Sequence, residues 1–282
     1  MIQLLPEERE SLAQYIHSLC GVTLDQSKAY LIESRLADVA AEAGCQSFLG
    51  LLRLARSDGS RELDHRIIDA ITTNETLFFR DTSPFDLLRQ KIVPDLIERR
   101  ARAGSARLRI WSAACSTGQE TYSIAILLKE ALGDPERYGV RLLGTDISEY
   151  AVGQANSGQY SAVEVSRGLS EVLRAKYFFP VASGWQIRDD IRAMASFRRF
   201  NLMADFAVLG KFDVIFCRNV AIYFSDRDRL ALFRRIERAL DPDGYLVVGA
   251  QESLAEAAPQ FEAKHHGRSV FYQLKTAGQP RR

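Results

Sequence analysis

One acidic side chain follows a turn of small residues near the middle of the chain. The apolar segment Leu108–Trp111 leads into the small-residue run Ala113–Gly118, and helical spacing of apolar residues follows. A strand, turn and helix in this order form the crevice of a nucleotide-binding sheet. Gly118 would let the backbone approach a ligand, and Glu120 would suit a hydroxyl or amino group better than a pyrophosphate. An ordinary strand-to-helix turn is the alternative.

A second acidic side chain, Asp146, ends the apolar segment that begins at Val140. At the carboxyl end of a parallel strand, a carboxylate can accept hydrogen bonds from both hydroxyls of an adenosine ribose. The alternative is a structural role, because Asp-Ile-Ser directly before Glu149 is also a good helix start. Together with the first strand and turn, the pattern favours the ligand crevice.

Polar side chains also follow the continuous apolar segment Phe212–Cys217, namely Arg218, Asn219 and Tyr223. The carboxyl ends of the strands form the ligand crevice of an open α/β sheet, so these side chains are expected to reach it. The alternative is that Arg218 is a surface cation and that Tyr223 packs in the interior.

The first 71 residues have the apolar spacing of helices and no strand alternation. They predict a small all-α domain at 1–71. Residues 72–107 are expected to form a linker segment that contributes to the crevice and is helical at 85–100. An α/β domain follows at 108–275, and the polar tail at 276–282 is expected to be disordered.

After residue 108, predicted strands and helices alternate, which indicates an α/β fold with a doubly wound, mostly parallel sheet and right-handed crossovers. A helix is predicted at 226–240, a turn at Asp241–Gly244 and a strand at 245–250. Strands at 261–264 and 269–274 are predicted to form a hairpin, which would make the last strand antiparallel.

The composition is that of a globular protein, with 282 residues, 46% hydrophobic and 26% charged, and a net charge of +1. This balance gives no overall attraction to nucleic acid or to an anionic membrane. There is no apolar run long enough for a membrane span and no basic signal segment, so we expect a cytoplasmic protein without membrane insertion. The cysteines form no CxxC pair and are expected to be reduced, mostly buried thiols without a metal: Cys20, Cys45, Cys115 and Cys217.

Five motifs carry a family resemblance. They are Ile71–Asp81, Ile110–Ala125, Gly144–Ser148, Phe200–Leu202 and Phe212–Phe224. In this order they resemble the CheR family, the methyltransferases of bacterial chemoreceptors, over nearly the whole chain. The resemblance implies a helical N-terminal domain on a class I S-adenosylmethionine-dependent domain with a small β-subdomain at about 177–199. It also implies the reaction, which is methylation of receptor glutamates to 5-O-methyl esters with release of S-adenosylhomocysteine.

The resemblance implies roles for particular residues as well. Asn74, Thr76 and Arg80 would contact the cofactor from the linker, and the Gly118 turn and Glu120 would bind its amino-acid part. Asp146 would bind the ribose, and Asn201 and Leu202 the adenine. Arg218 and Asn219 would bind the methionine end. Arg80 and Tyr223 are expected to position the substrate. A glutamate is already ionised near neutral pH, so no general base is needed.

Three segments depart from the family pattern. The segment Gly249–Glu252 differs from the commoner family motif, and the sequence does not explain why. The insert at Tyr177–Arg188 is shorter than in members that dock the C-terminal pentapeptide of a receptor, so methylation is expected to be independent of that pentapeptide. The helix after Lys28 is less basic than in well-known members, which points to a different receptor class.

The expected partner is the cytoplasmic helical methylation region of transmembrane chemoreceptors, and the protein is expected to be a monomer. The alternative function is a non-catalytic S-adenosylmethionine-binding or S-adenosylhomocysteine-binding scaffold of the same fold, which the presence of Arg80 and Tyr223 disfavours. A nucleic-acid amine methyltransferase would carry Pro-Pro and an aromatic where Cys217–Val220 stands. A dehydrogenase is disfavoured because the first turn lacks G-x-G-x-x-G.

Overall fold

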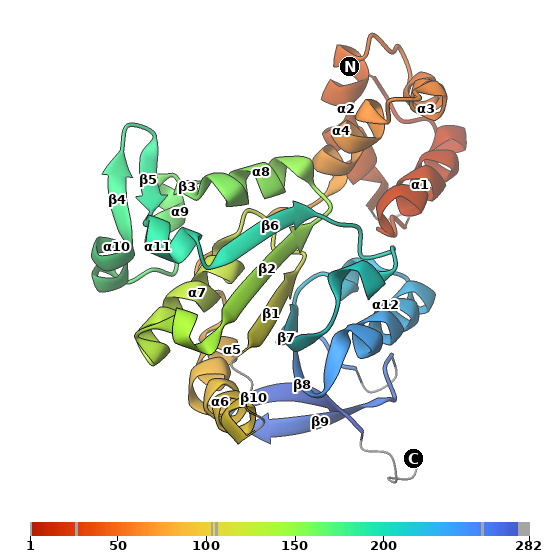
Figure 1. Ribbon diagram of the computed structural model, residues 1–282. Helices are drawn as coiled ribbons and strands as arrows, with labels where there is room; N and C mark the ends of the chain where they lie inside the picture. The colour runs from red at the N-terminus through yellow and green to blue at the C-terminus, as the bar shows by residue number, and fades with distance from the viewer. Residues whose placement is uncertain (1, 26–27, 103, 105–106, 255–256, 276–282) are drawn as a thin grey trace.

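The computed structural model describes residues 2–25, 28–102, 104, 107–254 and 257–275, so the predicted tail at 276–282 lies outside the described residues. An all-α domain sits beside an α/β domain, and an extended segment joins them (Figure 1). Within the described ranges, no helix combines the length and apolar composition needed to cross a bilayer.

The N-terminal domain confirms the predicted all-α unit. Its helices are α1 (Pro6–Cys20), α2 (Ala29–Glu42), α3 (Phe48–Ser57) and α4 (Glu62–Ile71). Leu12 and Ile16 of α1 lie one turn apart and pack in one core with Leu36 and Phe48, because residues four apart share a helix face. Gly21 ends α1 in the left-handed region at φ 76° and donates its N–H to the carbonyl of His17.

The linker contains the predicted helical stretch in three parts. They are α5 (Thr82–Leu87), a π-helical turn (Leu88–Ile92) and α6 (Val93–Arg102). Phe85, Leu88 and Leu96 are buried against the sheet. The linker therefore packs as part of the α/β domain.

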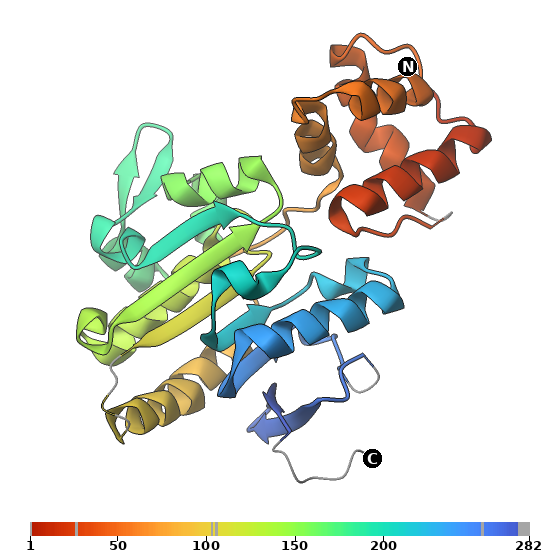
Figure 2. The same cartoon turned by 45° about the vertical axis from the view of Figure 1, so that its right-hand side comes forward.

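The main sheet has seven strands in the order β6-β2-β1-β7-β8-β10-β9 (Figures 1 and 2). They are β1 (Leu108–Ala113), β2 (Val140–Asp146), β6 (Ala195–Arg199), β7 (Phe212–Cys217), β8 (Leu240–Val248), β9 (Phe261–His266) and β10 (Ser269–Leu274). The first five pair in parallel, and β10 is antiparallel to both its neighbours. The predicted α/β class, parallel sheet and antiparallel last strand are confirmed.

Both faces of the central strands are covered, which explains why β7 is buried at every position. Val214 and Phe216 pack on the side of α7, while Ile215 and Cys217 face α12. The remaining helices are α7 (Gln119–Leu132), α8 (Glu149–Ser157), α9 (Ala162–Ser166), α10 (Glu171–Tyr177), α11 (Asp189–Arg192) and α12 (Asp226–Ala239), with 3₁₀ turns at Pro135–Tyr138, Phe206–Leu209 and Ala221–Tyr223. Cys20, Cys115 and Cys217 are buried free thiols, as predicted, and Cys45 is partly buried.

Two boundaries differ from the sequence prediction. The predicted turn Asp241–Gly244 lies inside β8, where Phe212 pairs with Leu240 and Val214 with Tyr245, so the intervening residues form a bulge. The second difference concerns the insert predicted at about 177–199, because β6 belongs to the main sheet and pairs with β2.

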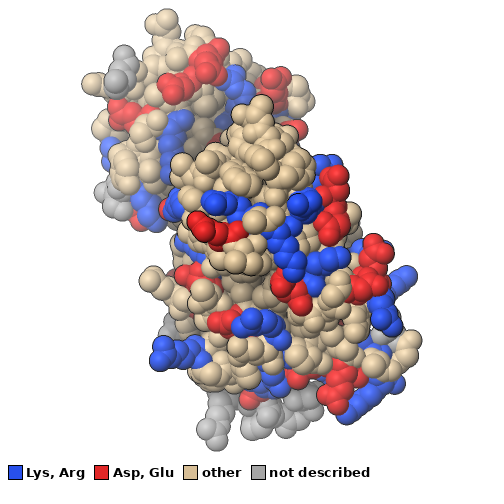
Figure 3. Space-filling view, turned by 90° about the vertical axis from the view of Figure 1, so that its left-hand side faces the viewer, with Lys and Arg blue, Asp and Glu red and all other residues tan. Residues whose placement is uncertain are grey.

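The small sheet consists of β3 (Gln159–Tyr160), β5 (Gly184–Ile187) and β4 (Phe178–Val181), paired antiparallel in this order. The small sheet therefore begins at Gln159, before the predicted start at about 177, and ends at Ile187, before the predicted end at about 199. The face of the molecule that carries it shows basic and acidic side chains interspersed (Figure 3).

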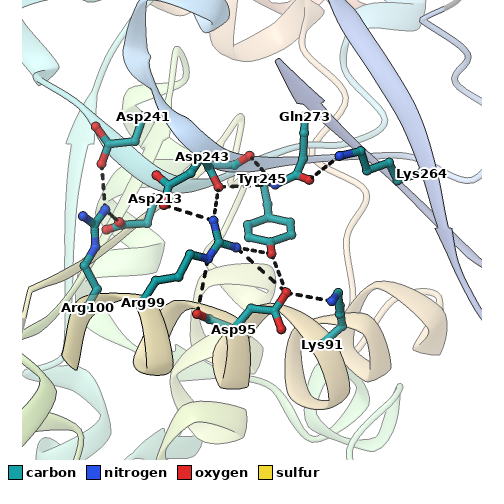
Figure 4. Close-up of polar contacts among 11 residues, drawn as sticks. Lys91, Asp95, Arg99, Arg100, Asp213, Asp241, Asp243, Tyr245, Lys264 and Gln273 are labelled. Carbon is teal, nitrogen blue, oxygen red and sulfur yellow. Dashed lines mark hydrogen bonds and ion pairs between the residues drawn. The ribbon is translucent and has the colours of Figure 1, made fainter. Parts of the chain in front are cut away.

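A polar network fixes α6 to the amino-terminal ends of β7 and β8 (Figure 4). Arg100 forms ion pairs with Asp213 and Asp241, while Arg99 pairs with Asp243 at 3.0 Å. This network accounts for the bulge, because it holds the side chains of Asp241 and Asp243 toward α6 instead of in a free turn. It lies at the end of the sheet opposite the predicted crevice.

Candidate active site

A cavity lies where the carboxyl ends of β1, β2 and β7 meet the linker and the N-terminal domain. Ten of the predicted site residues line it, namely Asn74, Thr76, Arg80, Glu120, Asp146, Asn201, Leu202, Arg218, Asn219 and Tyr223. Strands far apart in the sequence thus bring the predicted polar groups to one place, as the rule for parallel sheets requires.

Gly118 is the exception among the predicted residues, because it does not line the cavity. It caps α7 at φ 97°, and a Cβ there would lie 2.9 Å from the Cβ of Ala155 and 3.1 Å from the hydroxyl of Tyr160. The expected close approach of Gly118 to a ligand therefore stays a prediction, and the structure shows a second reason for the glycine. The glycine is needed for the left-handed turn and for packing against α8.

Asp146 ends β2 and is almost fully buried. Its Oδ2 accepts the backbone N–H of Ser116 at 2.8 Å, and its Oδ1 accepts that of Ser148 at 3.0 Å. Burial raises the pKa of this carboxyl, although these hydrogen bonds oppose the shift. Ser148, whose hydroxyl accepts the N–H of Ala151, is the N-cap of α8, so capping does not explain Asp146. Each carboxylate oxygen has a further lone pair for a ligand hydroxyl.

Arg218 lies directly after β7 and is buried, with 2% of its side chain exposed. Its guanidinium donates to Glu120 at 2.8 Å and to Asp81 at 2.9 Å. Glu120 also accepts the hydroxyl of Ser112 at 2.8 Å. A buried cation thus has two carboxylate partners, which joins the linker to β7 and α7.

Arg80 provides the contrasting cation of the cavity. Its guanidinium donates to the backbone carbonyl of Glu75 at 3.0 Å. Within the part of the chain that the structure describes, no carboxylate forms an ion pair with it. Arg80 therefore keeps hydrogen-bond donors for an anionic ligand, whereas the charge of Arg218 is already balanced.

Glu252, which the sequence analysis did not select, organises the loop after β7. Its carboxylate accepts the backbone N–H groups of Asn219 at 2.7 Å, Ala221 at 3.1 Å and Gly249 at 2.7 Å. Asn219 adopts φ 57°, which is uncommon for a residue other than glycine. A Cβ at Gly249 would lie 2.6 Å from the carboxylate of Glu252, so a larger residue there would displace this carboxylate. The sequence did carry one signal for Glu252, because this residue lies just beyond the carboxyl end of β8, the strand next to β7.

The N-terminal domain also contributes to the cavity, which the sequence analysis missed. Cys20 and Val22 line it, and the N–H of Thr23 donates to the carbonyl of Tyr223 at 2.9 Å. The amide of Asn201 donates to the carbonyl of Leu19 at 2.8 Å. These contacts join sequence segments about 180–200 residues apart, so local patterns could not reveal them.

Comparisons with known proteins agree with this arrangement. Residues 74–270 match the model of the CheR methyltransferase SAM binding domain, and residues 7–72 match that of the CheR methyltransferase all-alpha domain. The chain is 37% identical over 271 residues to "Chemotaxis protein methyltransferase Cher2" of Pseudomonas putida, covering 94% of this chain and 97% of that protein. It is 38% identical over 268 residues to "Chemotaxis protein methyltransferase 1" of Pseudomonas aeruginosa, covering 93% and 95%. The chain therefore belongs to the CheR methyltransferase family.

Proposed function

We propose that this protein transfers a methyl group from S-adenosylmethionine to glutamate side chains of chemoreceptors and so forms glutamate 5-O-methyl esters for sensory adaptation. The observation that carries the proposal is the cavity at the strand ends, which is lined both by the Asp146 carboxylate and by Arg80, a cation without an ion-pair partner among the described residues. The relatives are named chemotaxis protein methyltransferases, which supports the same activity.

The cavity lining fits S-adenosylmethionine. Asp146 offers acceptor oxygens for the ribose hydroxyls, and Leu202 with Phe200 offers apolar surface for the adenine. Glu120, held by Arg218 at 2.8 Å, faces the amino-acid end. When bound, S-adenosylmethionine supplies an electrophilic methyl group on a sulfonium. In this proposal the chain binds it, orients it and excludes water.

The substrate glutamate needs orientation more than activation. Its carboxylate is ionised near neutral pH, so no residue has to remove a proton. The Arg80 guanidinium can hold one carboxylate oxygen, and the Tyr223 hydroxyl can orient the other. Holding two reactants in line supplies about 7–11 kcal/mol of the barrier reduction.

The test is a transfer assay with labelled S-adenosylmethionine and membranes from the protein's own cell. The wild type should give base-labile label on a receptor band. Arg80→Ala should abolish label, while calorimetry still detects cofactor binding, and Arg89→Ala on the exposed linker helix is the matched control. If the wild type gives no base-labile label, the proposal is refuted. The alternative function, a non-catalytic scaffold that binds S-adenosylmethionine, would then remain. Normal turnover in Arg80→Ala, or loss of its cofactor binding, would overturn the role of Arg80 in positioning the substrate.

The proposal has three finer parts. The protein acts in the cytoplasm as a monomer, and it methylates the helical methylation region of its receptor without using a C-terminal pentapeptide. The small sheet supports the last part, because a tight hairpin connects β4 and β5. Deleting the pentapeptide from the receptor should leave the methylation rate unchanged, and a large loss of rate would contradict this. Light scattering tests the monomer.

A further inference from the structure

One face of α12 gathers positive charge outside the cavity. Arg227, Arg234 and Arg238 are exposed, and Arg235 is partly buried. These four residues, the α12 arginines, border a surface hollow, with the loop at 203–205 on the other wall. Residues seven and eleven positions after Arg227 return to the same side of a helix, so the exposed three form one stripe.

The charge of the α12 arginines is only partly balanced locally. Within the described residues, no carboxylate forms an ion pair with an α12 arginine. Asp228 binds His17 at 2.8 Å and Asp226 pairs with Arg229 at 3.4 Å. Asp228 and Asp205 also attract Arg235 through space, which offsets part of its charge. Asp205, on the wall of the hollow, accepts the N–H of Ala207 at 3.1 Å. The hollow is therefore positive on a molecule whose net charge is only +1.

Arg235 strengthens this field from beneath the stripe. Its guanidinium lies 5.6 Å from the ring centre of Phe206. Its Nε and Nη2 are buried and have no hydrogen-bond partner among the described residues. A guanidinium with unpartnered donors keeps an attraction for an incoming carboxylate.

The hollow lies beside the cavity. The loop after β6 lines the cavity through Asn201 and Leu202 and lines the hollow through its next three residues. Helix α12 begins two residues after Phe224, which is part of the cavity wall. Figure 2 shows α12 at the front of the α/β domain, with its first turn nearest the N-terminal domain. A protein bound along α12 would therefore reach the cavity.

The basic residue of α2, by contrast, is used inside the protein. Arg35 donates to the carbonyl of Ile71 at 2.6 Å and to the hydroxyl of Thr73 at 3.1 Å. It therefore holds the linker and has fewer donors left for a partner. This leaves α12 as the stronger surface for an acidic partner.

We propose that the α12 arginines bind an acidic helix of the substrate protein and so deliver its target glutamate to the cavity. This inference rests on the proposed function, since it names the surface that recognises the receptor. The stripe from Arg227 to Arg238 spans about 16 Å, or three helical turns, which matches carboxylates spaced one turn apart on a partner helix. Complementary charge of this kind favours encounter and register more than intrinsic reactivity.

The test is the double variant Arg234→Glu/Arg238→Glu, compared with Arg89→Glu/Arg102→Glu, which makes the same charge change on exposed linker helix positions. With receptor-containing membranes, we expect KM for the receptor to rise about tenfold or more in the α12 variant, with kcat and calorimetric affinity for S-adenosylmethionine unchanged. The linker variant should match the wild type. Added salt should raise KM for the wild type and much less for the α12 variant.

The outcomes separate the two proposals. If the wild type transfers no methyl group, the proposed function fails and this inference fails with it. If the wild type is active and both variants have its KM, only the α12 inference is overturned. Lost cofactor affinity in the α12 variant would also overturn it, as would tight binding of duplex DNA that depends on these arginines. The milder pair Arg234→Gln/Arg238→Gln, with a smaller rise in KM, replaces the first if circular dichroism shows misfolding.

Discussion

Two arginines lie at opposite ends of β7. Each pairs with two carboxylates, but the two clusters have different roles. Arg218 follows the strand and pairs with Glu120 and Asp81, while Arg100 pairs with Asp213 and Asp241 at the start of the strand. In both, Nε is buried without a partner among the described residues. Arg218 lines the cavity at the carboxyl ends of the strands, whereas Arg100 lines a separate pocket between α6 and the start of β1.

The difference teaches how to separate function from stability in this fold. Both clusters cross-link segments distant in sequence, so both are expected to stabilise the fold. The exposed fraction is 2% for the Arg218 side chain and 27% for the Arg100 side chain, so breaking the first leaves a more costly unpaired charge. A variant at the cavity end should lose stability and binding together, whereas one at the other end should lose stability alone.

The largest effect is expected for Arg218→Ala. It leaves Glu120 and Asp81 near one another without their cation, which costs about 3–5 kcal/mol for a broken buried pair. Urea denaturation should show this loss, and calorimetry should show that S-adenosylmethionine binding has become undetectable. Normal binding by the folded fraction would mean that the cluster at the cavity is structural only.

Asp213→Asn tests the opposite end. The carboxylate also accepts the backbone N–H of Arg109 at 2.7 Å, so the variant weakens both the strand contact and the pair with Arg100. We expect a loss of about 1.5–3 kcal/mol in the free energy of unfolding, as for hydrogen bonds to charged groups. The affinity for S-adenosylmethionine of the folded protein should stay within about twofold, because the site lies at the other end of the strand. A tenfold weaker affinity would remove the distinction between the two ends.

The Asp146 carboxyl, at the cavity end of the sheet, should make cofactor affinity depend on pH. Burial raises its pKa above the ordinary 3.8, and its protonated form is a poorer acceptor for ribose hydroxyls. Cofactor affinity should therefore fall as pH falls through the raised pKa. The sign for folding is opposite, because the stability that this shift contributes is present at low pH and is lost as pH rises through the folded pKa.

Asp146→Asn is the control for that titration. The amide cannot ionise, so its affinity should be flat over the same pH range and lower at neutral pH by about 1.5–3 kcal/mol, or roughly tenfold to a hundredfold. Calorimetry at a series of pH values measures both. A wild-type affinity as flat as that of the variant would exclude Asp146 as the titrating acceptor.

Sequence patterns predicted the strand ends well because parallel strands align their carboxyl ends by rule. Asp146 and Arg218 could be placed at one edge before any coordinates, since each follows an apolar run. The packing role of Gly118 was missed, because its partners Ala155 and Tyr160 lie on later elements. Glu252 was missed although it lies just beyond a strand end, because its three hydrogen bonds go to backbone groups, whose position the residue types do not reveal.

The smallest effect is expected for Asp241→Asn, at the same end as Asp213. Burial and the neighbouring Asp213 charge raise the pKa of Asp241, whereas Arg100 lowers it, so its ionised form is held less favourably in the folded state than in the unfolded chain. A neutral amide of the same shape should therefore change the free energy of unfolding by less than about 0.5 kcal/mol. The pair Asp213→Asn and Asp241→Asn, measured by urea denaturation under one set of conditions, ranks the two partners of Arg100. Equal losses would mean that the cation is shared evenly, and the asymmetry inferred for this end of the sheet would be wrong.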